Sequence, residues 1–420
     1  MEPTATSAPS RDIGLWRQPG FGKLWGAVTA ANLADGVTLA AVPLAAAALT
    51  SDPALIAGTV VAQRLPWLLF SLPAGVLVDR LDRRLLLVSA NLLRALALGL
   101  FAVTLEVGVD GSAGLALLYG AGFLVGSAET VADNSSIAIT PALVPREHLD
   151  RANGRIFAAM PVANELVGPP VGAWLFAVAA AWAFSGSAAA FAVAGVLALA
   201  LRGTFRVALP PERPRRAMRA EVAEGLRWFA GNRVVRAAAL EAAGSNLLSA
   251  ATGSILIVLA QDRLGLDAQG FGFFLATAAV GGILGGWLAD RTVAVAGPGP
   301  TILLSMVVPA VGFAIIALTR NPLVAGGGLA LGSFAAMLGN VVTHTLRQRA
   351  VPDHLLGRVT SAYRLVGLGA LPIGGLLGGI VARYANVTAV FWMAAAGMLV
   401  LAALIGPILT TANLRAAEAG

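Results

Sequence analysis

Six ionisable side chains lie inside long apolar segments of the first half of this sequence, where they could carry protons or other ions. They comprise four acids and two bases: Asp35, Arg64, Arg94, Glu129, Asp133 and Glu165. A charge at mid-membrane depth costs at least ~2.5 kcal/mol on insertion scales, so such residues usually face the protein interior and mark ion or substrate paths. Burial also disfavours the charged form of a carboxyl group. The excess of acids predicts that at least one of them can bind a proton near neutral pH.

The pairing of these charges leaves two interpretations open. Glu129 and Asp133 are spaced i, i+4 and share one helix face, where two ionised carboxylates would repel each other. Either one of them binds a proton, or each has an arginine partner in a static network. Such a network could join Asp35 or Glu129 to Arg64, and Asp133 to Arg94. For Asp35 and Glu129, which lie nearest the middle of their segments, we expect proton or cation handling.

Long apolar segments must position these residues. The chain of 420 residues is 57% hydrophobic and only 12% charged, with a mean hydropathy of +0.79. Soluble domains carry about 25% charged residues, and a membrane-spanning helix needs roughly 20 apolar residues. We therefore predict an all-α polytopic membrane protein with twelve transmembrane helices. They lie at approximately 21–48, 55–78, 84–106, 113–139, 152–180, 183–202, 236–261, 268–289, 299–319, 322–346, 357–381 and 386–411.

Basic residues gather on one side of the predicted spans. The termini and the connections that follow even-numbered spans hold most arginines, including nine between Arg202 and Arg236. The opposite connections contain only Arg263, Arg320 and Arg383. Basic loops stay cytoplasmic, so we expect a multi-pass protein of the cytoplasmic membrane with both termini inside. The net charge of +7 thus orients the protein in the lipid bilayer and does not indicate nucleic-acid binding.

An internal repeat divides the chain into two parallel halves. The sequence "GVLVDR" at 75–80 recurs as "GWLADR" at 286–291, and "VPREHLDR" at 144–151 recurs as "VPDHLLGR" at 351–358. Each half holds six predicted spans, and two such halves around a central site are a transporter architecture. We expect a cytoplasmic N-terminus (1–20, too polar for a signal peptide), two six-helix halves (21–203 and 236–411), a cytoplasmic central loop (204–235) and a cytoplasmic C-terminus (412–420). The central loop contains "RAMRAEVAEGLRWF", typical of a basic amphipathic helix at the membrane surface.

The loop after the second span carries the pattern Gly-x-x-x-Asp-Arg-x-x-Arg-Arg. It is complete at Gly75, Asp79, Arg80, Arg83 and Arg84, and partial at Gly286, Asp290 and Arg291. With twelve spans and a basic central loop, the chain resembles the major facilitator superfamily. The segments "NLADG", "RLPWLLFSLPAG", "SAETVADNSS" and "RANGRIFAAMPVANELVGPPVG" are similar to its enterobactin-exporter-like and macrolide-exporter-like branch. The resemblance implies that Gly75, Asp79 and Arg80 latch the cytoplasmic side closed, with the second copy as a related gate.

The fifth predicted span contains a Gly-Pro motif. Gly168, Pro169 and Gly172 stand in "GPPVG", where proline removes a backbone donor and bends a helix. Flanking glycines allow close helix packing, and the family resemblance links such a motif to proton antiport. Glu165, just before it, is a proton-coupling candidate that could instead contact substrate.

Polar residues in other spans are candidates for lining a cavity. They are Asn164, Asn246, Asn340, Tyr363 and Arg364. Otherwise the second half reads as mainly apolar, which together with the acidic first half favours cationic or neutral lipophilic substrates.

Several classes of function find no support in the sequence. It has no cysteine, only three histidines without metal-pair spacing, no nucleophile–base pair and no phosphate-binding loop. We therefore expect no enzyme activity, no metal and no cofactor. We predict a secondary active transporter, functional as a monomer, that exports small amphipathic molecules by proton antiport. The alternatives are an importer or facilitator of a small polar metabolite, or a lipid flippase on the same fold.

Overall fold

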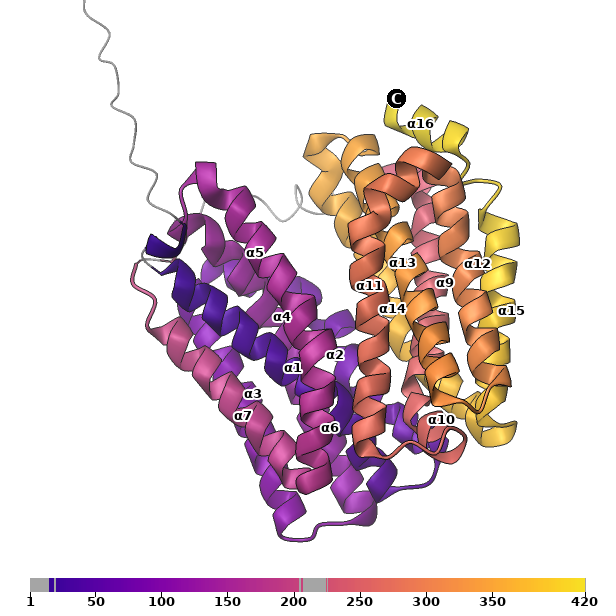
Figure 1. The fold of residues 1–420 in the computed structure, drawn as a ribbon. Coiled ribbons are helices and arrows are strands. Elements are labelled where there is room, and N and C mark those ends of the chain that lie inside the picture. Colours follow the sequence, from indigo (N-terminus) through magenta and orange to yellow (C-terminus); the bar gives the residue numbers. More distant parts are fainter. Residues whose placement is uncertain (1–14, 19, 204, 207–223, 225, 420) are drawn as a thin grey trace, which may run out of the picture.

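The computed structural model consists of α-helices in two bundles, and it describes residues 15–18, 20–203, 205–206, 224 and 226–419 (Figure 1). The first bundle contains η1 (Leu15–Arg17), α1 (Phe21–Leu49), α2 (Pro53–Arg80), α3 (Arg83–Glu106), α4 (Gly111–Leu143), η2 (Arg146–His148), α5 (Leu149–Pro161), η3 (Val162–Val167), α6 (Gly168–Val178) and α7 (Ala180–Leu199). The second contains α9 (Arg233–Ser254), α10 (Leu256–Asp262), α11 (Ala268–Ala296), α12 (Pro298–Leu318), α13 (Pro322–Ala350), α14 (Asp353–Tyr384), α15 (Val387–Ile405) and α16 (Thr411–Ala419). The all-α polytopic fold with two six-helix halves is confirmed.

The fifth predicted span is a broken helix. Among the described residues, eleven helices are long and apolar enough to cross a membrane, and the span expected at 152–180 is not one of them. It is divided into α5, the π-helix η3 and α6. Pro161 ends α5, and Pro169 and Pro170 open α6. Proline lacks the backbone donor that an α-helix needs, so the hydrogen-bond register changes between these prolines. Single π-helical turns of this kind are frequent at functional sites.

Short polar caps separate helices that the apolar pattern alone would merge. The Asp52 side chain accepts the backbone N–H of Ala54 at 2.9 Å, with Pro53 at the first helical position of α2. Asn321 caps α13 in the same way, ahead of Pro322. A side-chain cap followed by proline satisfies the free N-terminal donors of a helix and fixes where it begins.

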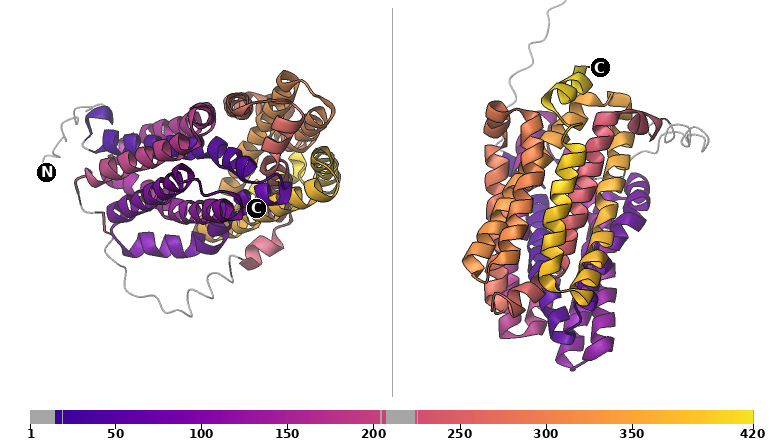
Figure 2. Two further views of the ribbon diagram at one scale, coloured as in Figure 1. Left: turned by 90° about the horizontal axis from the view of Figure 1, so that it is seen from below. Right: turned by 90° about the vertical axis from the view of Figure 1, so that its right-hand side faces the viewer.

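The two bundles touch at one end and diverge toward the end that carries α16 and the start of α1 (Figures 1 and 2). Helices α2 and α14 form much of this contact. A Cβ added at Gly379 would lie 2.7 Å from Cβ of Ala57, and one at Gly375 would lie 3.3 Å from Cβ of Val60. At the end of the seam, Arg383 Nη1 lies 3.1 Å from Asp52 Oδ2. The close contact therefore runs from the end where α2 begins and α14 ends to the middle of both helices, where a Cβ at Gly369 would lie 3.3 Å from Leu68 Cδ1.

At the opposite end the expected approach of a neighbour to Gly75 is absent. Among the described residues, nothing lies within 4 Å of a Cβ added at Gly75. Asp79 and Arg80 are exposed, and no described residue forms an ion pair with either. The halves have separated here, so the predicted latch is not engaged in this conformation. Most of the predicted N-terminus and of the basic helix in the central loop lies outside the described residues, although 226–231 are helical.

The seam between α2 and α14 can be tested by cross-linking, because the chain has no native cysteine. We expect Val60→Cys with Gly375→Cys to form a disulfide on mild oxidation, since the Cβ separation is close to the ~3.5–4.5 Å that disulfides require. The cross-link should stop transport until a reductant is added. A protease site is inserted between the two halves and cleaved after oxidation. Cross-linked halves then run as one band on a non-reducing gel, whereas halves without the disulfide run as two. The pair Gly75→Cys and Gly357→Cys, on the same helices beyond the seam, should remain uncross-linked; equal yields for the two pairs would contradict the arrangement.

Candidate functional site

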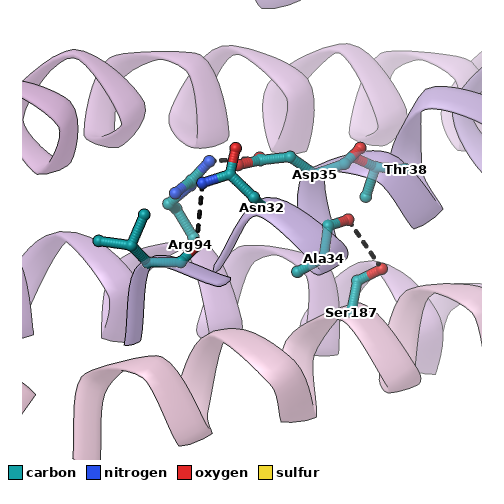
Figure 3. A network of polar contacts seen from close by, with 7 residues as sticks. Asn32, Ala34, Asp35, Thr38, Arg94 and Ser187 are labelled. Atoms are coloured by element: carbon teal, nitrogen blue, oxygen red, sulfur yellow. Dashed lines mark hydrogen bonds and ion pairs between the residues drawn. The ribbon is translucent and has the colours of Figure 1, made fainter. Parts of the chain in front are cut away.

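An ion pair between α1 and α3 lies in the core of the first bundle. Arg94 Nη2 bonds Asp35 Oδ1, and the two side chains point toward each other (Figure 3). Arg94 is only 1% exposed, and its Cζ lies 4.1 Å from the ring centroid of Phe191 on α7. The static network that the sequence left open would have joined Arg94 to Asp133, and Arg64 to Asp35 or Glu129. The structure instead joins Asp35 to Arg94, because both lie at the same depth on facing helices.

The pair borders a cavity of about 370 Å³ within the first bundle. Asp133 on α4 lines the same cavity, and Glu129 lies one turn earlier on that helix. Asp35 and Asp133 thus share this cavity with two guanidiniums, Arg94 and Arg364 of α14, and among the described residues the Asp35–Arg94 contact is the one ion pair there. Arg64 on α2 is half-buried, and no carboxylate of a described residue lies within ion-pair distance of it.

Backbone contacts place the broken fifth span directly against the residue that follows Asp35. A Cβ at Gly168 would lie 2.6 Å from the carbonyl carbon of Gly36, and one at Gly172 would lie 2.8 Å from Cα of Val37. Glycines that face one another in this way let helix backbones touch. The backbone of Asn164, in the π-helical turn, packs on Gly36, while the Glu165 side chain is exposed. The Gly-Pro motif is thus a packing site beside the ion pair.

A second cavity of about 640 Å³ lies in the second bundle. The predicted residues Asn246, Asn340, Tyr363 and Arg364 all line it. Asn246 Nδ2 also donates to the Gly367 carbonyl at 2.9 Å, which ties α9 to α14.

Charged residues that the sequence interpretation did not select also line this second cavity. They include the buried carboxylate Glu241, whose Oε1 accepts the Ser245 hydroxyl at 2.9 Å, and Arg347. These two charged groups add to the polar candidates that the sequence placed in an otherwise mainly apolar second half. Because the predicted span 322–346 ends just before it, Arg347 was placed in a basic cytoplasmic connection. Its spacing of three residues from His344 indicates that both lie on one helix face.

The arginines of the predicted gating loop divide by their contacts. Arg83 Nη1 donates to the Ala138 carbonyl at 2.9 Å, and Arg84 Nη1 donates to the Leu201 carbonyl at 2.9 Å. Both bonds remain inside the first bundle and fix the loop to α4 and to the end of α7. In the second copy, Asp290 is exposed and the Arg291 guanidinium lies 5.5 Å from the ring centroid of Trp287.

The arrangement defines a membrane transport protein: two helical bundles, each with a polar cavity, in contact at one end only. The chain belongs to the Major Facilitator Superfamily, whose family model matches residues 24–370. It is a transporter and not an enzyme, and the family needs no cofactor. Among the described residues, no cluster of three His, Cys, Asp or Glu could hold a metal ion.

Comparison with known proteins agrees with this assignment. The chain is 26% identical over 316 residues to the enterobactin exporter EntS of Escherichia coli and of Escherichia fergusonii, covering 72% of either chain. Its fold is similar to the nucleoside transporter NupG, with a TM-score of 0.77 at 12% identity, over 92% of this chain and 98% of that one. It is also similar to a bacterial homologue of the iron transporter ferroportin in an inward-facing state, with a TM-score of 0.74 at 16% identity, over 93% and 98%.

Proposed function

We propose that the protein exports small amphipathic molecules across the cytoplasmic membrane in exchange for protons. The buried Asp35–Arg94 pair carries the proposal, because Asp133 lines the same cavity and Glu129 lies one turn from Asp133 on α4, so that several carboxyl groups gather where a proton can be exchanged. The similarity to enterobactin exporters supports the outward direction. As a functional monomer, the chain would need only a substrate, the bilayer and the proton gradient.

The positive-inside rule supports a cytoplasmic location for both termini. In that orientation the diverging end of the bundles faces the cytoplasm, and the seam with Asp52 and Arg383 closes the outer side. The conformation is then open to the cytoplasm, with Gly75, Asp79 and Arg80 separated from the other half. Closing this end would engage them as a latch while the outer seam opens, which is alternating access by movement of one half against the other.

A proton that arrives from outside would neutralise Asp35 and weaken its hold on Arg94. The freed guanidinium could then turn to Asp133 on α4, which lines the same cavity, or to Glu129 one turn earlier. Because Gly168 and Gly172 pack against the residues that follow Asp35, a shift of α1 would also move the fifth span. Protonation at one residue is thereby connected to a helix that also contacts the second bundle, where Pro169 meets Gly272 of α11.

Efflux from everted vesicles tests the coupling. We expect Asp35→Asn, which mimics the protonated carboxyl, to transport a fluorescent substrate at a rate that no longer depends on the imposed pH gradient. Glu129→Gln should weaken that dependence, because it removes one competitor for Arg94. The rate is measured with and without a gradient, and Asp262→Asn, an exposed residue at the end of α10, serves as a matched acid-to-amide change away from the pair. An unchanged gradient dependence in both Asp35→Asn and Glu129→Gln would refute proton coupling at this site.

A further inference from the structure

The second-half cavity holds two arginines, one of which, Arg364, also borders the first-half cavity. Arg347 on α13 and Arg364 on α14 both line the 640 Å³ cavity. Of the carboxylates in the part of the chain that the structure describes, none lies within ion-pair distance of either guanidinium. Ionisable residues within membrane spans usually mark ion or substrate paths, so two cations without an ion-pair partner in one cavity indicate a ligand that carries the opposite charge.

Stacking holds Arg347 in place. Its Cζ lies 3.8 Å from the ring centroid of Tyr363, and the Tyr363 hydroxyl donates to the Ala238 carbonyl at 3.1 Å. The ring is therefore anchored to α9, and the guanidinium rests on its face. A guanidinium held in this way keeps its edge N–H groups for a planar anion, which it can bind through two parallel hydrogen bonds. Arg364 follows Tyr363 directly in α14, is exposed, and also borders the first-half cavity.

The charge balance of the lining is positive. Glu241 is the one carboxylate among the described residues around this cavity, and it bonds the Ser245 hydroxyl. Two guanidiniums against one carboxylate leave a net positive charge, whether Glu241 is ionised or protonated; a proton on His344 would add to it. Leu329 and Leu368, both partly exposed, supply an apolar part of the same wall. The cavity thus combines a cationic region with an apolar one in a volume typical of small-molecule sites.

We propose that the exported substrate is an amphipathic organic anion, whose acidic group binds Arg347 and Arg364 while its apolar part lies against the apolar wall. This inference rests on the export function proposed above and names its substrate class. It replaces the cationic or neutral substrate that the sequence alone favoured. The exporter would collect the anion from the cytoplasm, because the diverging end of the bundles gives access to both arginines.

Binding of a matched pair of fluorescent probes tests the proposal. Dansylglycine carries a carboxylate, and dansylglycinamide has nearly the same shape without the charge. We expect purified protein in lipid nanodiscs to bind dansylglycine about tenfold more tightly by fluorescence anisotropy, the size expected for charge-assisted hydrogen bonds. In Arg347→Gln and in Arg364→Gln the preference should fall to roughly twofold or less.

Two further variants separate charge from packing. Arg349→Gln lies two residues from Arg347, but its side chain is exposed and pairs with Glu418 at 3.6 Å, so it should keep the full preference. Arg347→Lys retains the charge and should recover part of the preference, even though it loses the stacked geometry. Equal affinity for the two probes, or a preference that survives in the double variant Arg347→Gln with Arg364→Gln, would overturn the inference.

The same probes distinguish this inference from the export function on which it rests. Gradient-driven efflux of dansylglycinamide, together with equal binding of the two probes, would leave the exporter in place and refute the anionic substrate. A clear binding preference for dansylglycine without gradient-driven efflux of either probe would support the anionic ligand and refute proton-driven export.

Discussion

Replacing Arg94 by methionine is expected to abolish transport and to lower the free energy of unfolding by about 3–5 kcal/mol, the range for breaking one partner of a buried ion pair. The Asp35 carboxyl would lose its only ion-pair partner among the described residues, and Phe191 would lose the guanidinium stacked on it. A buried carboxylate without a cation must either stay ionised at high cost or bind a proton permanently. Both outcomes remove the alternation that proton exchange requires. Thermal unfolding in detergent and vesicle efflux measure the two effects.

A double variant separates stability from function in this experiment. Arg94→Met combined with Asp35→Asn removes both charges, so it should recover much of the lost stability while transport remains independent of the pH gradient. Arg64→Met is the matched control, because Arg64 is half-buried in the same bundle without an ion-pair partner among the described residues. If Arg94→Met were no more destabilised than Arg64→Met, the Asp35–Arg94 pair would not hold the first bundle together.

Residue types and spacing were enough to predict the fold, because lipid leaves few solutions for an apolar chain. Every backbone polar group inside a bilayer must be satisfied within its own helix, so long apolar runs and arginine-rich loops predicted the helices and the repeat. The apolar pattern did not predict the break in the fifth span. Its apolar run is long enough, and only the prolines around residues 162–167 suggested that the helix would change register there.

Pair assignments within the site could not be read from the sequence. Depth along a span is visible as residue number, but the rotation of each helix, which decides whether Arg94 meets Asp35 or Asp133, depends on packing between helices. Arg347 illustrates the same limit. By sequence position Arg347 falls just after the predicted span 322–346, in a basic cytoplasmic connection. In the structure it stacks on the ring of Tyr363, sixteen residues later on another helix, and is part of a cavity wall.

The contact between the Gly-Pro motif and α1 connects the two parts of the proposed mechanism. Gly36 follows Asp35 in sequence, and its backbone touches Gly168 and Asn164. Because no side chain intervenes, α1 cannot shift without moving the fifth span. The π-helical turn at 162–167 leaves that span a place to bend. Proton binding at Asp35 can therefore act on the fifth span, whose helix α6 contacts α11.

Replacement of Gly168 by alanine is expected to reduce transport at least tenfold and to destabilise the protein by about 1–3 kcal/mol, the usual cost of overpacking. The added methyl group would lie 2.6 Å from the Gly36 carbonyl carbon, which is backbone and cannot rotate away. Transport should suffer more than stability, since α1 and the fifth span would be forced apart beside Asp35. Efflux and thermal unfolding are the measurements.

Two substitutions in the same span show whether the glycine contact or the proline bend matters. Gly154→Ala, where no described atom lies within 4 Å of the added carbon, should behave like the unaltered protein. Pro169→Ala keeps the Gly168 contact and restores a backbone donor, so we expect a smaller loss of transport than in Gly168→Ala. The reverse order, with Pro169→Ala inactive and Gly168→Ala active, would show that the bend carries the coupling and that the packing against Gly36 does not.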